Sequence, residues 1–519
     1  MINFYNLKLL KIKDPKDNFV GIRKSKSGNS FEFCLPNGFQ DFPENDFDQV
    51  RELFFKMYRT FRKFERDNES SKRFQKNKPK YQQEQDQTTL SSKGISIQTE
   101  DGEICVLYSK IKMIEKVLEA YDNLTLQSIQ KKVKRSHDID YSQIHRYLDR
   151  AVYSDSDTIY VDLMDLPRPT VRYESTDLVH LYCYILDEIV QQLHGDVPDI
   201  IKVHSQDINF LAQHFKDDYL TYNQSIFDKD TFIETIIILK EALDNIDKNT
   251  YYKDDDYWGI YEAVETFLYG ELNPKDNDGY FWGIQGFSLI WEDMCHTYFF
   301  TKNRDAICFA DTDIPLKEYQ NSGRKEEEKN RVGNFQLPTK DDNGNSWIYQ
   351  TPSHIPYPKQ EGFFGWDELL CIEFDPQPGC LVYSDRNLDD FHKRDRTKAM
   401  RRFPRPDLLL KYNSEDSYNL YIIDYKDIAS DFYDKNLSRH PEQVDEKYRF
   451  DLIKQLTYEL ALQQINKVNV SENWFFIPYF YDKTFKQNFK TEINIKGIKI
   501  VKANFSFIQE VYLLENYDQ

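Results

Sequence analysis

The pattern of hydrophobic and polar positions predicts a helix near the start of the chain. Hydrophobic residues recur at helical spacing between residues 47 and 64. Asp46 precedes this segment and Gln49 lies three residues further on, which predicts an N-cap with a capping-box partner. We therefore expect residues 1–66 to form a small N-terminal unit of a strand-like start and one helix.

The next segments differ sharply in polarity. Residues 67–93 are almost wholly polar, which predicts a linker. Residues 94–271 begin with strand-like alternation and continue with mostly helical periodicity, clearest at 228–246, where Asp228 or Asp230 is the expected N-cap. This region contains no recognisable catalytic pattern, so we expect it to serve as a scaffold or in specificity or partner docking.

The remaining residues, 272–519, predict an α/β domain interrupted by a polar insert at 317–346. The predicted elements are a helix at 287–300, strands at 405–412 and 419–426, a helix at 450–465, and strands at 473–480 and 493–505. This order favours a mixed sheet flanked by helices.

Composition narrows the class of protein. Aromatic residues make up 15% of the 519 residues, which excludes general disorder. The net charge of −19 argues against a protein that coats nucleic acid with its whole surface, but it allows a local basic groove.

The seven scattered cysteines include no CxxC pair, which favours reduced cytosolic thiols over structural zinc. No apolar run approaches the roughly 18 residues of a membrane helix and no signal peptide is recognisable, so we expect a cytoplasmic protein.

Two of the predicted strands carry residues suited to phosphodiester hydrolysis. Asp407 opens the strand at 405–412, and Asp424 and Lys426 end the strand at 419–426. Residues i and i+2 of a strand share a face, and pairing of the strands would bring Asp407 to the same edge. Carboxylates can hold Mg²⁺ against a phosphate, and the metal lowers the pKa of a bound water. A neighbouring lysine can position that water or counter charge at the transition state.

Residues of the two predicted helices extend this set. Glu292 lies in an otherwise aromatic and aliphatic helix, where a carboxylate needs a partner such as a metal, or else forms a salt bridge on the helix surface. His296, one turn later, is either an auxiliary site residue or a packed histidine. Gln455 and Tyr458 share a helix face and could hydrogen-bond the DNA backbone or the carboxylates, or simply form a polar face.

A basic run precedes the first catalytic strand. Seven of the 14 residues at 392–405 are Lys or Arg, which favours phosphate binding over a merely solvated loop. These candidate DNA-binding residues are Lys393, Arg394, Arg396, Lys398, Arg401, Arg402 and Arg405.

The chain has no GxxxxGK[ST] loop, so we do not expect it to hydrolyse nucleoside triphosphates by itself.

Taken together, the pattern FPRPD…YIIDYK…KQLTY with an upstream WE helix resembles the PD-(D/E)xK nuclease superfamily. More narrowly, the chain resembles the LlaJI-type restriction endonucleases, relatives of the McrC subunit of McrBC systems. The narrower resemblance lies in residues 144–164, 281–294 and 402–426. It implies a restriction-endonuclease-like fold and a bacterial DNA endonuclease of a restriction or phage-defence system.

The resemblance also implies roles for individual residues and a cofactor. Asp407, Asp424 and Glu292 would be metal ligands, Lys426 the catalytic lysine and Gln455 a supporting residue. The implied metal is Mg²⁺, which Mn²⁺ can replace, and the implied substrate is double-stranded DNA. The implied partners are a McrB-like AAA+ subunit that binds GTP or ATP and the DNA methyltransferases of the same system. Two alternatives stay open: a regulatory subunit that docks into a partner NTPase ring, and a nuclease acting alone in repair or on RNA.

Overall fold

The computed structural model divides the chain into two compact units. It describes residues 2–69, 94–135, 175–270, 280–310 and 406–514, with short gaps inside these ranges, and a few short segments at 144–172 and 372–383. Residues 1–3 and 111–272 form the helical unit. Residues 4–110 and 273–519 form the sheet unit, which is therefore built from two segments that are separated in the sequence.

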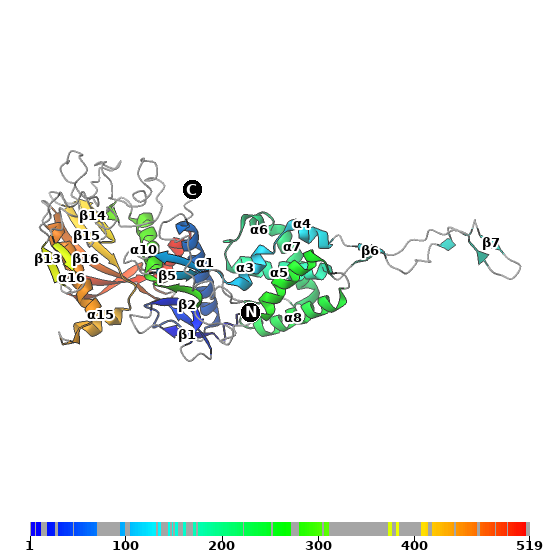
Figure 1. Ribbon diagram of the computed structural model, residues 1–519, viewed down its shortest axis with the longest axis horizontal. Coiled ribbons are helices and arrows are strands. Elements are labelled where there is room, and N and C mark those ends of the chain that lie inside the picture. The colour runs from blue at the N-terminus through cyan, green and yellow to red at the C-terminus, as the bar shows by residue number, and fades with distance from the viewer. Residues whose placement is uncertain are drawn as a thin grey trace, which may run out of the picture. The chain divides into compact units, whose positions relative to one another are not determined.

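The helical unit is built around the buried helix α5 (Ser175–Gln192) (Figure 1). Its helices are α3 (Lys112–Glu119), α4 (Asn123–Gln130), α5 (Ser175–Gln192), α6 (Asp199–Val203), α7 (Ser205–Tyr219), α8 (Phe232–Asn249) and α9 (Asp255–Tyr269). Its short strands are β6 (Val133–Arg135), β7 (Val152–Tyr153), β8 (Ile159–Tyr160) and β9 (Thr170–Arg172). Helix α5 contacts α3, α4, α7, α8 and α9, and the Tyr182 hydroxyl donates to the Val117 carbonyl at 2.8 Å. The expected helical character of this region is confirmed.

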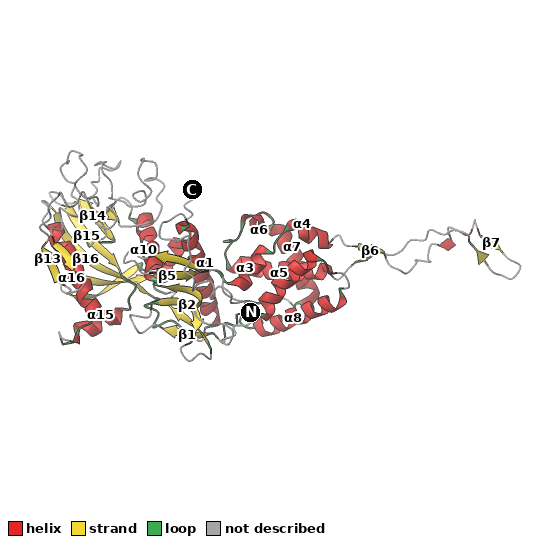
Figure 2. Cartoon of the chain, in the orientation of Figure 1, coloured by secondary structure: helices red, strands yellow, loops and turns green. Residues whose placement is uncertain are grey.

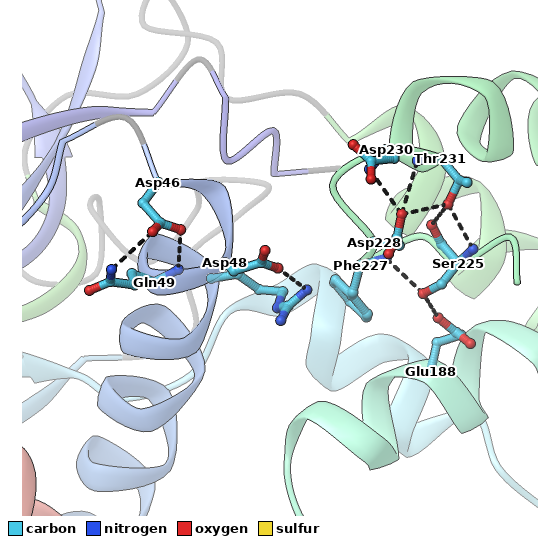
Figure 3. A network of polar contacts seen from close by, with 10 residues as sticks. Asp46, Asp48, Gln49, Glu188, Ser225, Phe227, Asp228, Asp230 and Thr231 are labelled. Atoms are coloured by element: carbon cyan, nitrogen blue, oxygen red, sulfur yellow. Dashed lines mark hydrogen bonds and ion pairs between the residues drawn. The ribbon is translucent and has the colours of Figure 1, made fainter. Parts of the chain in front are cut away.

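The turn before α8 differs from the expected capping. The N-cap is Thr231, not Asp228 or Asp230. The Asp228 carboxylate instead accepts from the backbone N–H groups of Asp230 and Thr231, at 2.9 and 3.1 Å (Figure 3). An aspartate that accepts from the residues following it closes a turn, so Asp228 shapes the approach to the helix rather than its first turn.

The first sheet of the sheet unit adds one strand from the middle of the chain to strands from the N-terminal segment. Its strands are β1 (Lys8–Lys11), β2 (Phe19–Lys24), β3 (Phe31–Leu35), β4 (Ile95–Gln98), β5 (Ile104–Tyr108) and β10 (Tyr280–Gln285), in the order β1-β3-β2-β10-β5-β4. Because β10 lies between β2 and β5, the expected separate unit at 1–66 is wrong. The expected boundary near residue 94 is also wrong, because β4 and β5 belong to this sheet and the helical unit begins at 111.

Helix α1 (Phe47–Asn68) packs on this sheet through aromatic side chains. Its Phe54 and Phe61 rings lie 5.0 and 5.1 Å from the ring of Trp282 in β10. The expected N-cap is confirmed: the Asp46 carboxylate accepts from the backbone N–H of Gln49 at 3.1 Å and from its side chain at 2.9 Å (Figure 3). The predicted linker at 67–93 begins inside this helix, and residues 70–93 lie outside the described residues.

The second sheet carries the predicted catalytic strands. Its strands are β11 (Ile307–Ala310), β14 (Leu408–Asn413), β15 (Tyr418–Tyr425), β16 (Val468–Tyr479), β17 (Phe489–Ile495) and β18 (Ile498–Asn504), in the order β11-β14-β15-β16-β18-β17. Strands β15, β16 and β18 are parallel, and the other pairs are antiparallel. A separate hairpin pairs β12 (Ile372–Asp375) with β13 (Cys380–Tyr383). The mixed α/β character is confirmed, but the strand expected at 493–505 is part of the hairpin β17–β18.

Helices cover both faces of this second sheet (Figure 2). They are α10 (Ser288–Lys302), α15 (Ser430–Leu437), α16 (Glu446–Gln463) and α17 (Phe505–Leu514). Successive residues of a strand face opposite sides. Phe475 therefore packs with Tyr433 and Leu452 of α15 and α16, whereas Phe476 contacts Trp291 and Phe299 of α10. The predicted insert at 317–346 lies outside the described residues.

The structure also bears on the expectations about membrane-spanning helices and about the cysteines. Among the described residues, none of the helices has the length and apolar character that crossing a membrane requires. The four cysteines whose side chains are described, Cys34, Cys105, Cys183 and Cys295, are buried free thiols. This agrees with the expectation of reduced, structurally packed cysteines.

Candidate active site

The end of β15 carries a buried ion pair. The Lys426 ammonium lies 2.5 Å from Asp424 Oδ2, so the two side chains share a face as the i, i+2 spacing predicts. Asp424 is only 1% exposed, and the Lys426 side chain is 13% exposed. Tyr425 lies on the opposite face, where its ring contacts His296 of α10 at 4.9 Å between ring centres.

Asp407 reaches the same place from the neighbouring strand. It immediately precedes β14, whose Leu408 pairs with Ile423 of β15. Its Oδ2 accepts from the Tyr425 backbone N–H at 2.5 Å, and its carboxyl group also hydrogen-bonds that of Asp424. The predicted convergence of Asp407 and Asp424 is therefore present in the structure.

The two carboxyl groups of this pair have opposite pKa shifts. Burial raises the pKa of Asp407 well above its ordinary value, and the nearby charges of Asp424 and Glu292 raise it further. For Asp424, burial also acts to raise the pKa, but the ammonium groups of Lys426 and Lys454 outweigh it and leave the pKa lowered. A proton on Asp407, donated to Asp424, relieves the repulsion between two adjacent buried carboxylates.

Helix α10 brings Glu292 and His296 toward the pair. Glu292 is mostly buried and close enough to raise the pKa of Asp407. The fully buried His296 contacts the Asp407 carbonyl oxygen through Nε2 at 3.1 Å. His296 is thus a packed histidine that also fixes the backbone beneath a candidate carboxylate.

Two residues of α16 join the site although the sequence pattern did not single them out. Asp451 Oδ1 lies 3.4 Å from the Lys426 ammonium, and Lys454 lowers the pKa values of Asp424 and Asp407. Burial acts to lower the pKa of Lys426, but Asp424 and Asp451 outweigh it and raise that pKa above its usual range. Asp451 lies one turn before Gln455 and so shares its helix face, and this spacing was the signal available in the sequence.

The structure assigns Gln455 and Tyr458 to packing positions. Gln455 is fully buried, and its Nε2 donates to Asn473 Oδ1 at 2.6 Å and to the Trp474 carbonyl at 3.3 Å. It therefore holds α16 against β16 beside the site. Tyr458 is also fully buried, with Lys454 5.8 Å from its ring centre. The expected contact of Tyr458 with the DNA backbone does not fit this position, because its side chain does not reach the surface.

The basic run at 392–405 lies outside the described residues. It contains the predicted DNA-binding residues Lys393, Arg394, Arg396, Lys398, Arg401, Arg402 and Arg405.

The described part of the helical unit has a pocket of about 410 Å³ between α4, α5 and α7, where the rings of His180 and His214 stack. The described candidate residues lie elsewhere, in the sheet unit.

The donor set at the end of β15 fits a hard divalent cation. Among the described residues, no three His, Cys, Asp or Glu side chains are grouped closely enough to enclose a metal on their own. Mg²⁺ does not need such a cage, because it commonly binds one or two carboxylates together with waters and substrate phosphates. Asp407 and Asp424 provide two adjacent carboxyl groups, and a bound cation would relieve their mutual repulsion.

Comparison with known proteins adds no further assignment to this geometry. No family model matches the sequence, and neither the curated proteins nor the solved structures contain a significant match to the chain. The functional argument therefore rests on the residues at the end of β15 and on the helices that surround them.

Proposed function

We propose that the chain is a metal-dependent nuclease that hydrolyses phosphodiester bonds of double-stranded DNA. The observation that carries this proposal is the convergence of Asp407, Asp424 and Lys426 at one edge of a mixed sheet. Two carboxyl groups and a lysine, mostly enclosed yet partly open to solvent, form a small set of groups able to support this reaction.

The roles of the residues follow from their positions. Asp407 and Asp424 would bind Mg²⁺, or Mn²⁺ in its place, and the Tyr425 backbone N–H holds the Asp407 carboxyl group in orientation. A bound divalent cation would lower the pKa of a water and neutralise phosphate charge. Lys426 would orient that water and stabilise the charge that develops on the phosphate. Glu292 contributes negative charge from α10.

The biological setting belongs to the same proposal. The basic run at 392–405 supports a polyanionic substrate, since Lys and Arg clusters bind phosphate backbones. The sequence resemblance supports a bacterial restriction system in which a McrB-like AAA+ NTPase and DNA methyltransferases act beside this chain. The absence of a phosphate-binding loop motif from the sequence is compatible with a separate NTPase subunit.

A plasmid-cleavage assay tests the reaction. The full-length protein should cut double-stranded plasmid DNA with Mg²⁺ or Mn²⁺ and should not cut it in EDTA. Asp424→Ala and Lys426→Ala should each reduce cutting by a factor on the order of 10² or more, since each removes a group acting on the reacting phosphate. The assay is run with the purified chain alone and with a McrB-like AAA+ NTPase added.

A matched control separates catalysis from general ion-pair loss. Asp431 and Lys435 form an exposed ion pair on α15 at 2.5 Å, so Lys435→Ala should cut like the unaltered protein. Full cutting by Lys426→Ala would contradict the proposal, as would the lack of metal-dependent cutting in every preparation, including those with the NTPase.

A further inference from the structure

Lys426 contacts two carboxylates that come from different elements. Its ammonium lies 2.5 Å from Asp424 Oδ2 at the end of β15 and 3.4 Å from Asp451 Oδ1 on α16. Asp451 is 4% exposed, and its second oxygen accepts from the Tyr433 hydroxyl at 3.5 Å. Asp451 is thus a buried carboxylate whose two oxygens each face a donor.

The closer of these two contacts competes with the proposed metal. Asp424 is both the nearer partner of Lys426 and, with Asp407, one of the two proposed ligands of the divalent cation. Two positive charges beside one buried carboxylate repel each other strongly, because the surroundings screen them poorly. A bound cation would therefore weaken the hold of Asp424 on the ammonium.

The displaced ammonium would need another partner within the site. A buried charge that loses its only counter-ion is costly, and removing one member of a buried ion pair strongly destabilises a protein. Asp451 is already 3.4 Å away and is not part of the proposed metal pair. It can hold the ammonium beside the reacting phosphate while Asp424 binds the cation.

We propose that Asp451 is a positioning residue, the counter-ion that retains Lys426 in the site when a divalent cation binds Asp407 and Asp424. This inference rests on the proposed nuclease function. It explains why the lysine has two buried carboxylate neighbours rather than one. It also predicts that Asp451 controls metal affinity through Lys426, although Asp451 does not bind the metal itself.

The test measures Mn²⁺ binding to the full-length protein by titration calorimetry, without DNA. Asp451→Asn should weaken Mn²⁺ binding by about 10- to 100-fold, as expected when a group that supports a metal site is lost. Lys426→Met should tighten binding, because no ammonium then competes for Asp424. In the Lys426→Met background, Asp451→Asn should change the affinity by no more than about twofold, because the residue it served is gone.

Two further variants separate positioning from a purely structural role. Asp451→Glu restores a carboxylate and should recover most of the Mn²⁺ affinity. Tyr433→Phe removes the other hydrogen bond to Asp451 and should leave the affinity unchanged, even if it lowers the melting temperature. An equal loss of affinity from Asp451→Asn in both backgrounds, or no loss in either, would overturn the inference.

Asp424→Asn distinguishes failure of this inference from failure of the proposed function. If Asp424→Asn abolishes Mn²⁺ binding while Asp451→Asn has no effect, the metal site stands and only the role of Asp451 is wrong. If Asp424→Asn leaves Mn²⁺ binding intact, the proposed metal site itself is wrong, and with it both proposals.

Discussion

The side-chain amide of Asn37 donates to both the backbone carbonyl and the Oδ1 atom of Asp427, each at 3.0 Å, across 390 positions of sequence. Asp427 directly follows Lys426, so this contact fixes the backbone where β15 leaves the sheet. The next residue, Gly38, has φ +82° and its carbonyl accepts from the Phe480 N–H at 3.0 Å. A Cβ at Gly38 would lie 2.1 Å from the Pro478 carbonyl, so glycine is required for this approach.

The Asn37–Asp427 contact predicts a pH-dependent stability. Burial raises the pKa of Asp427 to about 6, and the hydrogen bond from Asn37 opposes this rise. A folded-state pKa above the unfolded value of 3.8 means that the contribution of Asp427 is fully present below about pH 4 and is lost as pH rises to about 6. Asp427→Asn should abolish this decline, which amounts to roughly 2–3 kcal/mol at 1.36 kcal/mol per pKa unit.

Asn37→Ala provides the complementary change. Without the amide, the pKa of Asp427 should rise further, so the decline should extend to higher pH. Urea unfolding of both variants between pH 4 and pH 8 measures the effect. Parallel pH profiles for the unaltered protein and Asp427→Asn would show that this carboxyl group does not control the stability.

The local geometry of the candidate site could be predicted from sequence because it depends on short-range rules. The two-residue period of a strand fixes the shared face of Asp424 and Lys426, and antiparallel pairing brings Asp407 to the same edge. The contributions of Asp451 and Lys454 were not predicted, because they depend on the rotation of α16 against β16. The helical spacing places Asp451 on the same face as Gln455, but it does not show that this face reaches Lys426.

The long-range organisation of the sheet unit was less accessible to prediction. Helix α1 and its Asp46 cap follow from local periodicity and capping chemistry. The insertion of β10 between β2 and β5 does not, because it joins residues more than 170 positions apart in sequence. A polar segment such as 67–93 indicates a break in regular structure, but it does not reveal that the elements on either side belong to one sheet.

Replacing Asp407 by a residue that cannot ionise should stabilise the protein. The pKa of Asp407 is raised, so the folded protein keeps a proton that the unfolded chain releases above its ordinary pKa. The free energy of unfolding should therefore fall as the pH rises from the unfolded pKa toward the folded pKa. Asp407→Asn cannot ionise, and its side-chain oxygen can still accept from the Tyr425 N–H. In EDTA, this variant should therefore be more stable than the unaltered protein by about 1–2 kcal/mol at pH 8, which is within the usual range for a single stabilising substitution.

The same variant should lose this advantage near pH 3, below the ordinary pKa of 3.8, where Asp407 is largely protonated in both the folded and the unfolded chain. Chemical unfolding at the two pH values measures the difference. A stability advantage of equal size at both would mean that packing, rather than ionisation, distinguishes Asp from Asn at this position.

The start of α1 offers a matched pair of aspartates. Asp46 accepts from the backbone N–H of Gln49, whereas Asp48 forms an ion pair with Arg51 at 3.0 Å and is 56% exposed (Figure 3). Asp46→Ala should cost about 1 kcal/mol of unfolding free energy, the typical value of an N-cap. Asp48→Ala should cost less than about 0.5 kcal/mol, since exposed ion pairs contribute little. Thermal unfolding compares them, and equal losses would mean that charge at the helix start, not capping, is what matters.

Tyr458 tests the correction that the structure makes to the sequence interpretation. Its side chain is fully buried on α16, so Tyr458→Phe should leave the DNA affinity and its dependence on salt unchanged. Replacement of Arg401, Arg402 and Arg405 by Ala should instead weaken binding and flatten the salt dependence, because each lost phosphate contact lowers the slope by about one. Fluorescence anisotropy with a labelled duplex at several salt concentrations separates the two outcomes. A flatter slope for Tyr458→Phe would mean that α16 rearranges on DNA and exposes the hydroxyl group, and the buried position would then describe only the DNA-free protein.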